Sequence, residues 1–168
     1  MAIKTTGVDH IHVLVPSLDS FLELFDRLFE SEHTMQSEVE SVQGFNSTLR
    51  FHDATSTPFM DVFEPATEDG IVARELSRNG AGLSVLSFGV EDIEGSTAHA
   101  ESCGLRVVSR LGFPGVMSQV QFHPADTFGF QLEFVEYEPG AEERIAEIQR
   151  RKAAGEPVEG LRARESRR

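Results

Sequence analysis

A nine-residue pattern of apolar and polar residues recurs in this chain and decides how its fold is interpreted. HVLVPSLDS at residues 12–20 returns as SFGVEDIEG at residues 87–95. In both copies a mostly apolar run gives way to a polar residue that can cap a helix, and a helical segment follows. We interpret each copy as the passage from a β-strand into an α-helix, and the recurrence as an internal duplication.

Around the first copy the pattern predicts one complete module. A strand covers residues 8–15, Ser17 is the predicted N-cap, and three further strands are predicted at residues 33–40, 44–52 and 59–64, with turn residues at 53–58. The helix between them is indicated by apolar residues that recur at spacings of three and four: Leu18, Phe21, Leu22, Phe25, Leu28 and Phe29. Module one, residues 8–65, is therefore β-α-β-β-β.

Module two, residues 82–137, repeats this order after a short helical pattern (Ile71, Val72 and Leu76) and a glycine-rich stop. A strand at 83–90 leads to the predicted N-cap Asp92 and a helix ending near Cys103. The remaining strands are predicted at 105–110, 116–123 and 128–136. A second pair of matching stretches, residues 50–65 and 121–136, supports the duplication.

The fold class expected from these modules is α+β. Neither half can bury both faces of its own sheet, so we expect the two βαβββ modules to form one curved sheet around a central cleft. This domain covers residues 1–139. Residues 140–168 are predicted as a charged helix at 141–154 followed by a flexible, arginine-rich tail. The alternative is that this tail packs on a partner subunit or shields the cleft.

Composition excludes several classes of partner. The 168-residue chain carries a formal net charge of −13, which disfavours nucleic acid and anionic membrane surfaces. No apolar run approaches the roughly 20 residues of a membrane span, and we expect a cytoplasmic protein. The expected partner is a small molecule.

Three blocks resemble the vicinal-oxygen-chelate superfamily, and most closely its methylmalonyl-CoA epimerase-like branch. They are VDHIHVLVPSLDS at residues 8–20, FEPATEDGIVARELSRNGAGLSVLSFGVEDIEG at 63–95 and FHPADTFGFQLEFVE at 122–136. The resemblance implies one divalent metal ion in the cleft, with Zn, Mn, Co, Mg and Fe as candidates. Its ligands come from the first and last strands of each module, which match His10, Asp61 and Glu133, while the fourth position falls on Val85.

The chain departs from the epimerase pattern at two places. Val85 cannot bind a metal, so His12, on the same strand face as His10, is an additional candidate ligand. The catalytic glutamate of the epimerases precedes a Gln-Gly pair, and the residue before Gln43-Gly44 is Val42. Glu40, two residues upstream, is the candidate replacement, because strand side chains repeat every second residue. We therefore expect a different activity from that of methylmalonyl-CoA epimerase.

The remaining candidate roles follow from charge and position. An inward carboxylate at Glu133 needs compensation, and we predict a catalytic as well as a metal-binding role for it. Glu40 is the second candidate catalytic residue. Candidate substrate contacts are His12, Gln119, Ser118 and Phe45, although a phenylalanine such as Phe45 is as readily explained by the core.

Three functions remain open. The leading one is a metal-dependent enzyme that moves a proton next to a carbonyl group, as an epimerase, isomerase or lyase. The second is a metal-free binding or resistance protein of the same fold, suggested by Val85. The third is a non-haem iron dioxygenase, for which a second histidine ligand is needed.

The charged helix after Pro139 offers surface for subunit contact, and proteins with the fold that the resemblance implies commonly pair. We therefore predict a homodimer. Light scattering should give twice the 18.6 kDa chain mass over a wide concentration range. A constant monomer mass would contradict this expectation.

Overall fold

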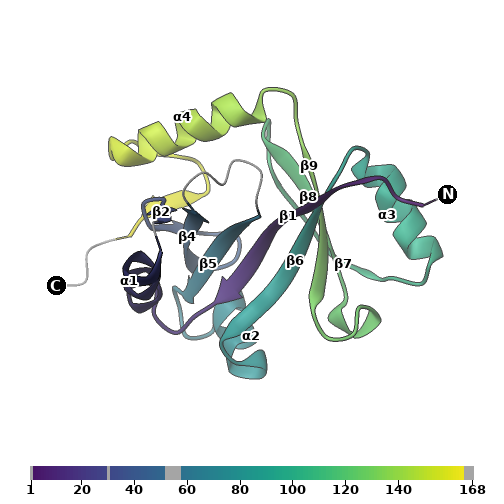
Figure 1. The fold of residues 1–168 in the computed structure, drawn as a ribbon, viewed down its shortest axis with the longest axis horizontal. Coiled ribbons are helices and arrows are strands. Elements are labelled where there is room, and N and C mark those ends of the chain that lie inside the picture. Colours follow the sequence, from purple (N-terminus) through teal and green to yellow (C-terminus); the bar gives the residue numbers. More distant parts are fainter. Residues whose placement is uncertain (1, 30, 52–57, 165–168) are drawn as a thin grey trace. The chain divides into compact units, whose positions relative to one another are not determined.

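The computed structural model describes residues 2–29, 31–51 and 58–164 (Figure 1). The architecture is α+β, as predicted. The chain divides into two compact units, one built from residues 1–11 and 83–146 and the other from residues 12–82 and 147–168. None of the described helices has the length and hydropathy that a membrane span requires.

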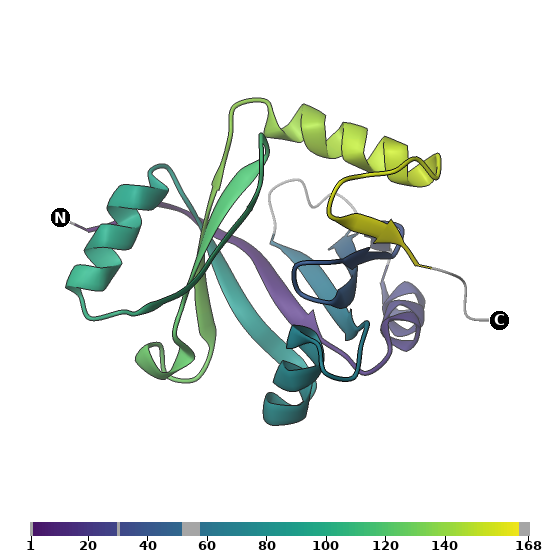
Figure 2. The ribbon, with the colours of Figure 1, turned by 180° about the vertical axis from the view of Figure 1, so that it is seen from behind.

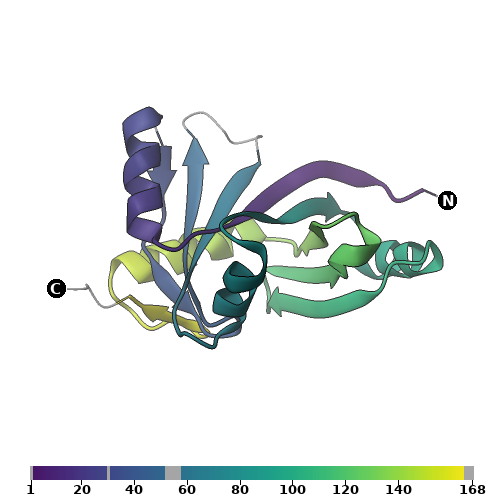
Figure 3. The ribbon, with the colours of Figure 1, turned by 90° about the horizontal axis from the view of Figure 1, so that it is seen from below.

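The unit that holds most of module one is a sheet with strand order β10-β3-β4-β5-β1, and β2 also pairs with β4. Its helix α1 packs against β4 and β5, as Figure 3 shows, and buries the core around Leu18, Leu49 and Val62. The elements are β1 (Thr5–Leu14), α1 (Leu18–Leu28), β2 (Ser31–His33), β3 (Ser37–Val39), β4 (Gly44–Phe51), β5 (Phe59–Pro65), α2 (Ile71–Asn79) and β10 (Leu161–Ala163).

The other unit has the strand order β1-β6-β9-β8-β7. Here α3 packs against β8 and β9, and the core surrounds Phe122, Val120 and Phe134. β6 and β9 are parallel, whereas β8 is antiparallel to both β7 and β9. The elements are β6 (Gly82–Val90), α3 (Ile93–Ser102), β7 (Val107–Phe113), β8 (Met117–Phe122), a 3-10 turn (Pro124–Asp126), β9 (Gln131–Tyr137) and α4 (Ala141–Ala153), whose last residues belong to the first-described unit.

The strand orders confirm the duplication. Starting from the first strand of each repeat, they read β1-β5-β4-β3 and β6-β9-β8-β7, which is the same order twice. Both predicted N-caps are present: the Ser17 hydroxyl accepts from Ser20 N–H at 3.3 Å, and the Asp92 carboxylate accepts from Gly95 N–H at 2.9 Å. The local sequence therefore fixes where each helix begins.

Some predicted strands differ in extent. The strand expected over 33–40 is divided into two short strands, β2 and β3. At Thr34 the side-chain hydroxyl, in place of a backbone carbonyl, accepts the Thr48 N–H, and the regular strand pairing stops there. β7 and β9 begin later than predicted, at Val107 and Gln131. The turn expected at 53–58 and the strand end at His52 lie largely outside the described residues.

The unit boundaries cut across the repeat at β1. The first residues of β1 bond to module two: Thr5 donates its hydroxyl proton to the Gly89 carbonyl at 2.9 Å, and Asp9 accepts from Tyr137. Later in the same strand, Val13 belongs to the core beneath α1. β1 is therefore shared, and the polar residues near its start lie against β6 and β9.

One glutamate in each module binds the N-terminus of its helix. Glu64 accepts from Leu18 N–H at 2.8 Å, and Glu136 accepts from Ile93 N–H at 2.9 Å. Leu18 and Ile93 are the first residues of α1 and α3, whose free N–H groups and positive dipole ends favour a carboxylate. This pair of contacts is a structural copy of the sequence repeat.

Within the described part of the chain, Glu64 also binds an arginine and Glu136 does not. The Arg164 Nη2 atom lies 3.2 and 3.1 Å from the two Glu64 carboxylate oxygens, and the guanidinium stacks 4.9 Å from the centre of the Phe45 ring. Just before Arg164, β10 pairs antiparallel with β3, visible in Figure 2 as the yellow strand beside a dark blue one. For residues 161–164 this ordered contact replaces the flexible tail expected from composition, because a buried counter-charge offsets the entropy of ordering the chain.

Glu64→Gln should destabilise the protein more than Glu136→Gln. The first change leaves Asp19, whose Oδ1 lies 3.5 Å from Arg164 Nη1, as the remaining carboxylate partner of the buried Arg164 among the described residues, at a cost of up to about 3–5 kcal/mol. The second change weakens a helix cap worth about 1 kcal/mol. Urea unfolding of the two variants measures the difference. Equal losses would show that Arg164 adds nothing to the Glu64 contact.

Candidate metal centre

His10 is held by a carboxylate that precedes it in the chain. The ring is only 1% exposed, and its Nδ1 lies 2.6 Å from Asp9 Oδ1. The same Asp9 oxygen accepts the Tyr137 hydroxyl proton at 2.9 Å. A carboxylate bonded to one ring nitrogen fixes the orientation of the ring and of its other nitrogen. This is the usual arrangement of a metal-binding histidine.

Glu133 lies at the other ring nitrogen and is fully buried. Its Oε1 is 3.2 Å from His10 Nε2 and also accepts from Gln119 Nε2 at 3.0 Å, while Oε2 accepts from Gln121 Nε2 at 2.8 Å. Gln131 Nε2 in turn donates to Gln121 Oε1 at 3.1 Å. These residues come from the site-facing side of β8 and β9, where side chains alternate between the helix-covered core and the other face. The amide donors lower the cost of burying the carboxylate.

A positive charge at the contact between His10 and Glu133 would stabilise the buried Glu133 carboxylate. Both ring nitrogens of His10 face carboxylate oxygens, and a cation between Nε2 and Glu133 would satisfy the lone pairs of both atoms. Metal–ligand bonds of roughly 2.0–2.2 Å place two neighbouring ligand atoms about 2.8–3.6 Å apart, depending on whether the coordination is octahedral or tetrahedral. The 3.2 Å separation therefore fits two ligands of a single ion.

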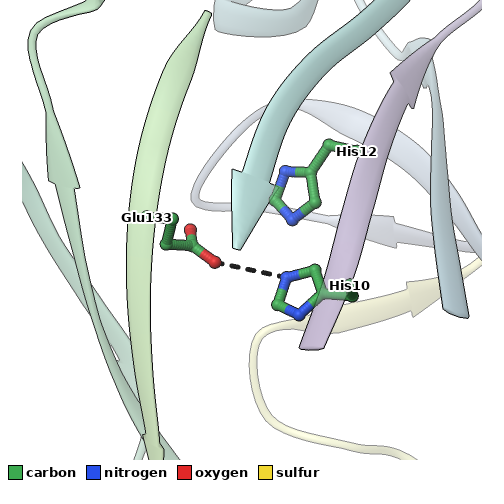
Figure 4. A group of neighbouring side chains, drawn as sticks. All are labelled: His10, His12 and Glu133. Carbon is green, nitrogen blue, oxygen red and sulfur yellow. Dashed lines mark ion pairs between the residues drawn. The ribbon is translucent and has the colours of Figure 1, made fainter. Parts of the chain in front are cut away.

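His12 lies two residues further along β1 and projects from the same face of the strand. Ligand atoms of His10, His12 and Glu133 all lie within 4.8 Å of one another. Figure 4 shows the three side chains, two from β1 and one from β9, turned toward one another. The His12 ring also packs against Phe63 at 5.2 Å between ring centres. Two imidazoles and one carboxylate are a ligand set for zinc or non-haem iron.

The group of three does not include Asp61, whose role as a ligand stays a prediction. Asp61 Oδ1 accepts the Thr48 hydroxyl proton at 2.6 Å, on the face of β4 and β5 away from α1. The Asp61 carboxylate interacts electrostatically with Lys152 of α4. Burial lowers the pKa of Lys152, and the negative charge of Asp61 partly opposes that shift. A lysine ammonium thus accompanies the Asp61 carboxylate.

Val85 occupies the position in β6 that His10 occupies in β1. It is buried and pairs with Gln131 in the parallel β6–β9 ladder, so its side chain points to the face that carries Glu133. The resemblance puts the fourth ligand at this position. At that position the site is apolar.

The other predicted site residues are distributed differently. Gln119 joins the site through Glu133, whereas the neighbouring Ser118 points to the opposite face of β8 and is exposed. Phe45 packs on the core beneath α1 and under Arg164, the core role that its sequence position also allowed. Both findings follow from the two-residue period of a strand.

Glu40 is exposed in a turn formed by residues 40–43, beyond the end of β3. The argument that it shares a strand face with Val42 therefore fails, because that alternation requires an extended backbone. Gln43 has a φ of 54°, and its carbonyl accepts the Ala66 N–H. The catalytic role of Glu40 stays a prediction.

Sequence reasoning missed Asp9, Tyr137 and Gln121 as parts of this centre. Gln119, Gln121 and Gln131 form a signal that was available: three glutamines at alternate positions in strands whose other faces are apolar. Asp9 and Tyr137 are 128 residues apart in the chain, and their contact depends on the placement of β1 beside module two.

No family model matches the chain, and no curated protein matches it. Solved structures do. A methylmalonyl-CoA epimerase from Mycobacterium tuberculosis is 21% identical, with a TM-score of 0.73 over 85% of this chain and 95% of that one. The Streptomyces coelicolor methylmalonyl-CoA epimerase, solved in complex with 2-nitronate-propionyl-CoA, is 25% identical, with a TM-score of 0.70 over 81% and 100%.

A further methylmalonyl-CoA epimerase, solved in complex with methylmalonyl-CoA and NH4+, is 27% identical, with a TM-score of 0.68 over 79% of this chain and 95% of that chain. These likenesses show that the chain has the vicinal-oxygen-chelate fold, which confirms the expectation from the sequence.

Proposed function

We propose that this protein is a divalent-metal-dependent enzyme that transfers a proton at the carbon next to a carbonyl group of a small molecule. The observation that carries the proposal is the buried pair His10–Glu133, in which the two facing atoms are 3.2 Å apart. A carboxylate and an imidazole held this way in a fully buried position are explained by a cation shared between them.

His10 Nε2, Glu133 Oε1 and His12 would hold the ion, with Asp61 as a further proposed ligand. When bound, a divalent cation supplies the Lewis acidity that polarises a carbonyl and stabilises the negative charge on its oxygen. Asp9 keeps the His10 ring in the orientation that presents Nε2. Gln119 and Gln121 hold the Glu133 carboxylate in place and exclude water from its oxygens.

The two carboxylates predicted to move the proton differ in their surroundings. Each oxygen of Glu133 accepts an amide N–H, and one of them also faces His10, which suits an anchoring ligand better than a base. Glu40 is exposed in the turn of residues 40–43. We therefore assign the ion to Glu133 and keep Glu133 and Glu40 as the two candidates for the proton transfer.

A second candidate function rests on the ligand set. His10, His12 and Glu133 are two histidines and one carboxylate, the combination that holds iron(II) in non-haem oxygenases. Oxygen uptake by the anaerobically iron-loaded protein in the presence of aromatic diols would favour this function. The metal-free binding protein is the third candidate, and its support is the apolar side chain at Val85.

His10→Ala and Glu133→Gln should each abolish most cation binding, and the double variant should lose little more than either, because the two side chains act as one unit. Mn²⁺ titration calorimetry on protein stripped with chelator measures this. Glu94→Gln is the matched control, since it removes the same charge from an exposed carboxylate of α3. The metalloenzyme proposal would be refuted if Glu133→Gln bound Mn²⁺ as well as the unchanged protein does and had a higher melting temperature in the absence of metal.

The chain should exchange the α-proton of methylmalonyl-CoA feebly or not at all, because Val42 stands where the resemblance places a glutamate. Proton NMR in D₂O with the Mn²⁺- or Co²⁺-loaded protein measures the exchange. Val42→Glu should raise the exchange rate by at least tenfold if the glutamate at position 42 is all that the unchanged protein lacks for this reaction. Rapid exchange by the unchanged protein would contradict the expectation, and its loss in Glu40→Gln would then identify Glu40 as the base.

A further inference from the structure

Within its ladder with β9, β6 presents three positions toward the face that carries Glu133. In the parallel ladder with β9, Val85 stands opposite Gln131, Ser87 opposite Glu133 and Gly89 opposite Val135. Register partners in a ladder project from the same face, while Phe88 and Val90 pack on the helix-covered core. Of the three positions, Ser87 alone offers a polar side-chain atom.

The Ser87 hydroxyl is buried without a hydrogen-bond partner among the described residues. The residue is 0% exposed, and only one other buried side-chain oxygen in the described part of the chain, Ser37 Oγ, is in the same condition. A buried hydroxyl that makes no hydrogen bond costs stability, so each one calls for an explanation. Alanine would fill nearly the same space at Ser87 without that cost.

The position of Ser87 supplies the explanation. Neighbouring strands lie about 4.8 Å apart, so an ion or oxygen atom beside the Glu133 carboxylate is within reach of the hydroxyl of its register partner. A hydroxyl both donates and accepts, and can therefore contact a cation directly or bind a water molecule on it. Val85, two residues earlier on the same face, can do neither.

We propose that Ser87 is a residue of the cation site and takes over the fourth position that Val85 leaves without a ligand. This inference rests on the proposed metal-binding function and adds to it an oxygen donor from β6. A neutral hydroxyl oxygen beside the Glu133 carboxylate makes the site richer in oxygen, which favours ions such as Mn²⁺ and Mg²⁺ relative to a site with a histidine at position 85.

The test compares the unchanged protein with Ser87→Ala and Ser37→Ala. Ser37 is the matched control because it carries the other buried, unpartnered hydroxyl and lies on β3, three strands from β1 in its own unit. The measurements are Mn²⁺ titration calorimetry on chelator-stripped protein, and melting temperatures with and without Mn²⁺.

Without metal, both substitutions should raise the melting temperature or leave it unchanged, because each removes a buried, unpaired hydroxyl. With Mn²⁺, only Ser87→Ala should differ: its dissociation constant should rise about 10- to 100-fold, and its Mn²⁺-induced shift in melting temperature should shrink. A purely structural role for Ser87 would move the metal-free melting temperature and leave the Mn²⁺-induced shift as in the unchanged protein.

The possible failures are distinguishable. If the unchanged protein binds Mn²⁺ and Ser87→Ala binds it equally well, the role of Ser87 is refuted while the metalloenzyme stands. If the unchanged protein binds neither Mn²⁺ nor other divalent ions, both proposals are overturned. An equal loss of affinity in Ser37→Ala would also overturn the assignment, since the effect would then not be specific to the site.

Discussion

The burial of the Glu133 carboxylate is the constraint on which the site depends. A carboxylate removed completely from water must be compensated by hydrogen bonds or positive charge. Gln119 and Gln121 supply amide donors from β8, and His10 supplies the ring nitrogen from β1. All of these contacts require the register of the strands to be correct, because a slip of one residue would turn each side chain to the opposite face.

The two repeats have kept the same helix contacts and diverged in their polar chemistry. Glu64 and Glu136 hold the first residues of α1 and α3 in nearly the same way. Each helix needs such a contact, because its first N–H groups lack partners wherever it lies. The first-strand position, in contrast, is His10 in one repeat and Val85 in the other.

Addition of the C-terminal segment introduces an asymmetry that the duplication alone would not produce. Glu64 is paired with Arg164 beside Phe45, whereas the contact of Glu136 recorded among the described residues is the one to its helix. Residues 161–163 contribute a strand to the edge of β3 and thereby cover backbone groups that would otherwise be open to pairing. The segment is therefore part of the structure of its unit.

The sequence by itself determined the duplication, the two helix starts and the α+β class, because these depend on local patterns: capping residues, side-chain periods and recurring strand-to-helix stretches. It also marked His10 and Glu133 as candidate site residues. Tertiary structure decided which of the patterned residues meet. Asp9 and Tyr137 are brought together across 128 positions, Ser118 is turned away from Gln119, and Glu40 falls in a turn instead of a strand. Arg164 gave no local signal at all. Its place depends on a buried carboxylate 100 residues away, and charge pairing over such a separation is set by the packed fold rather than by neighbouring residues.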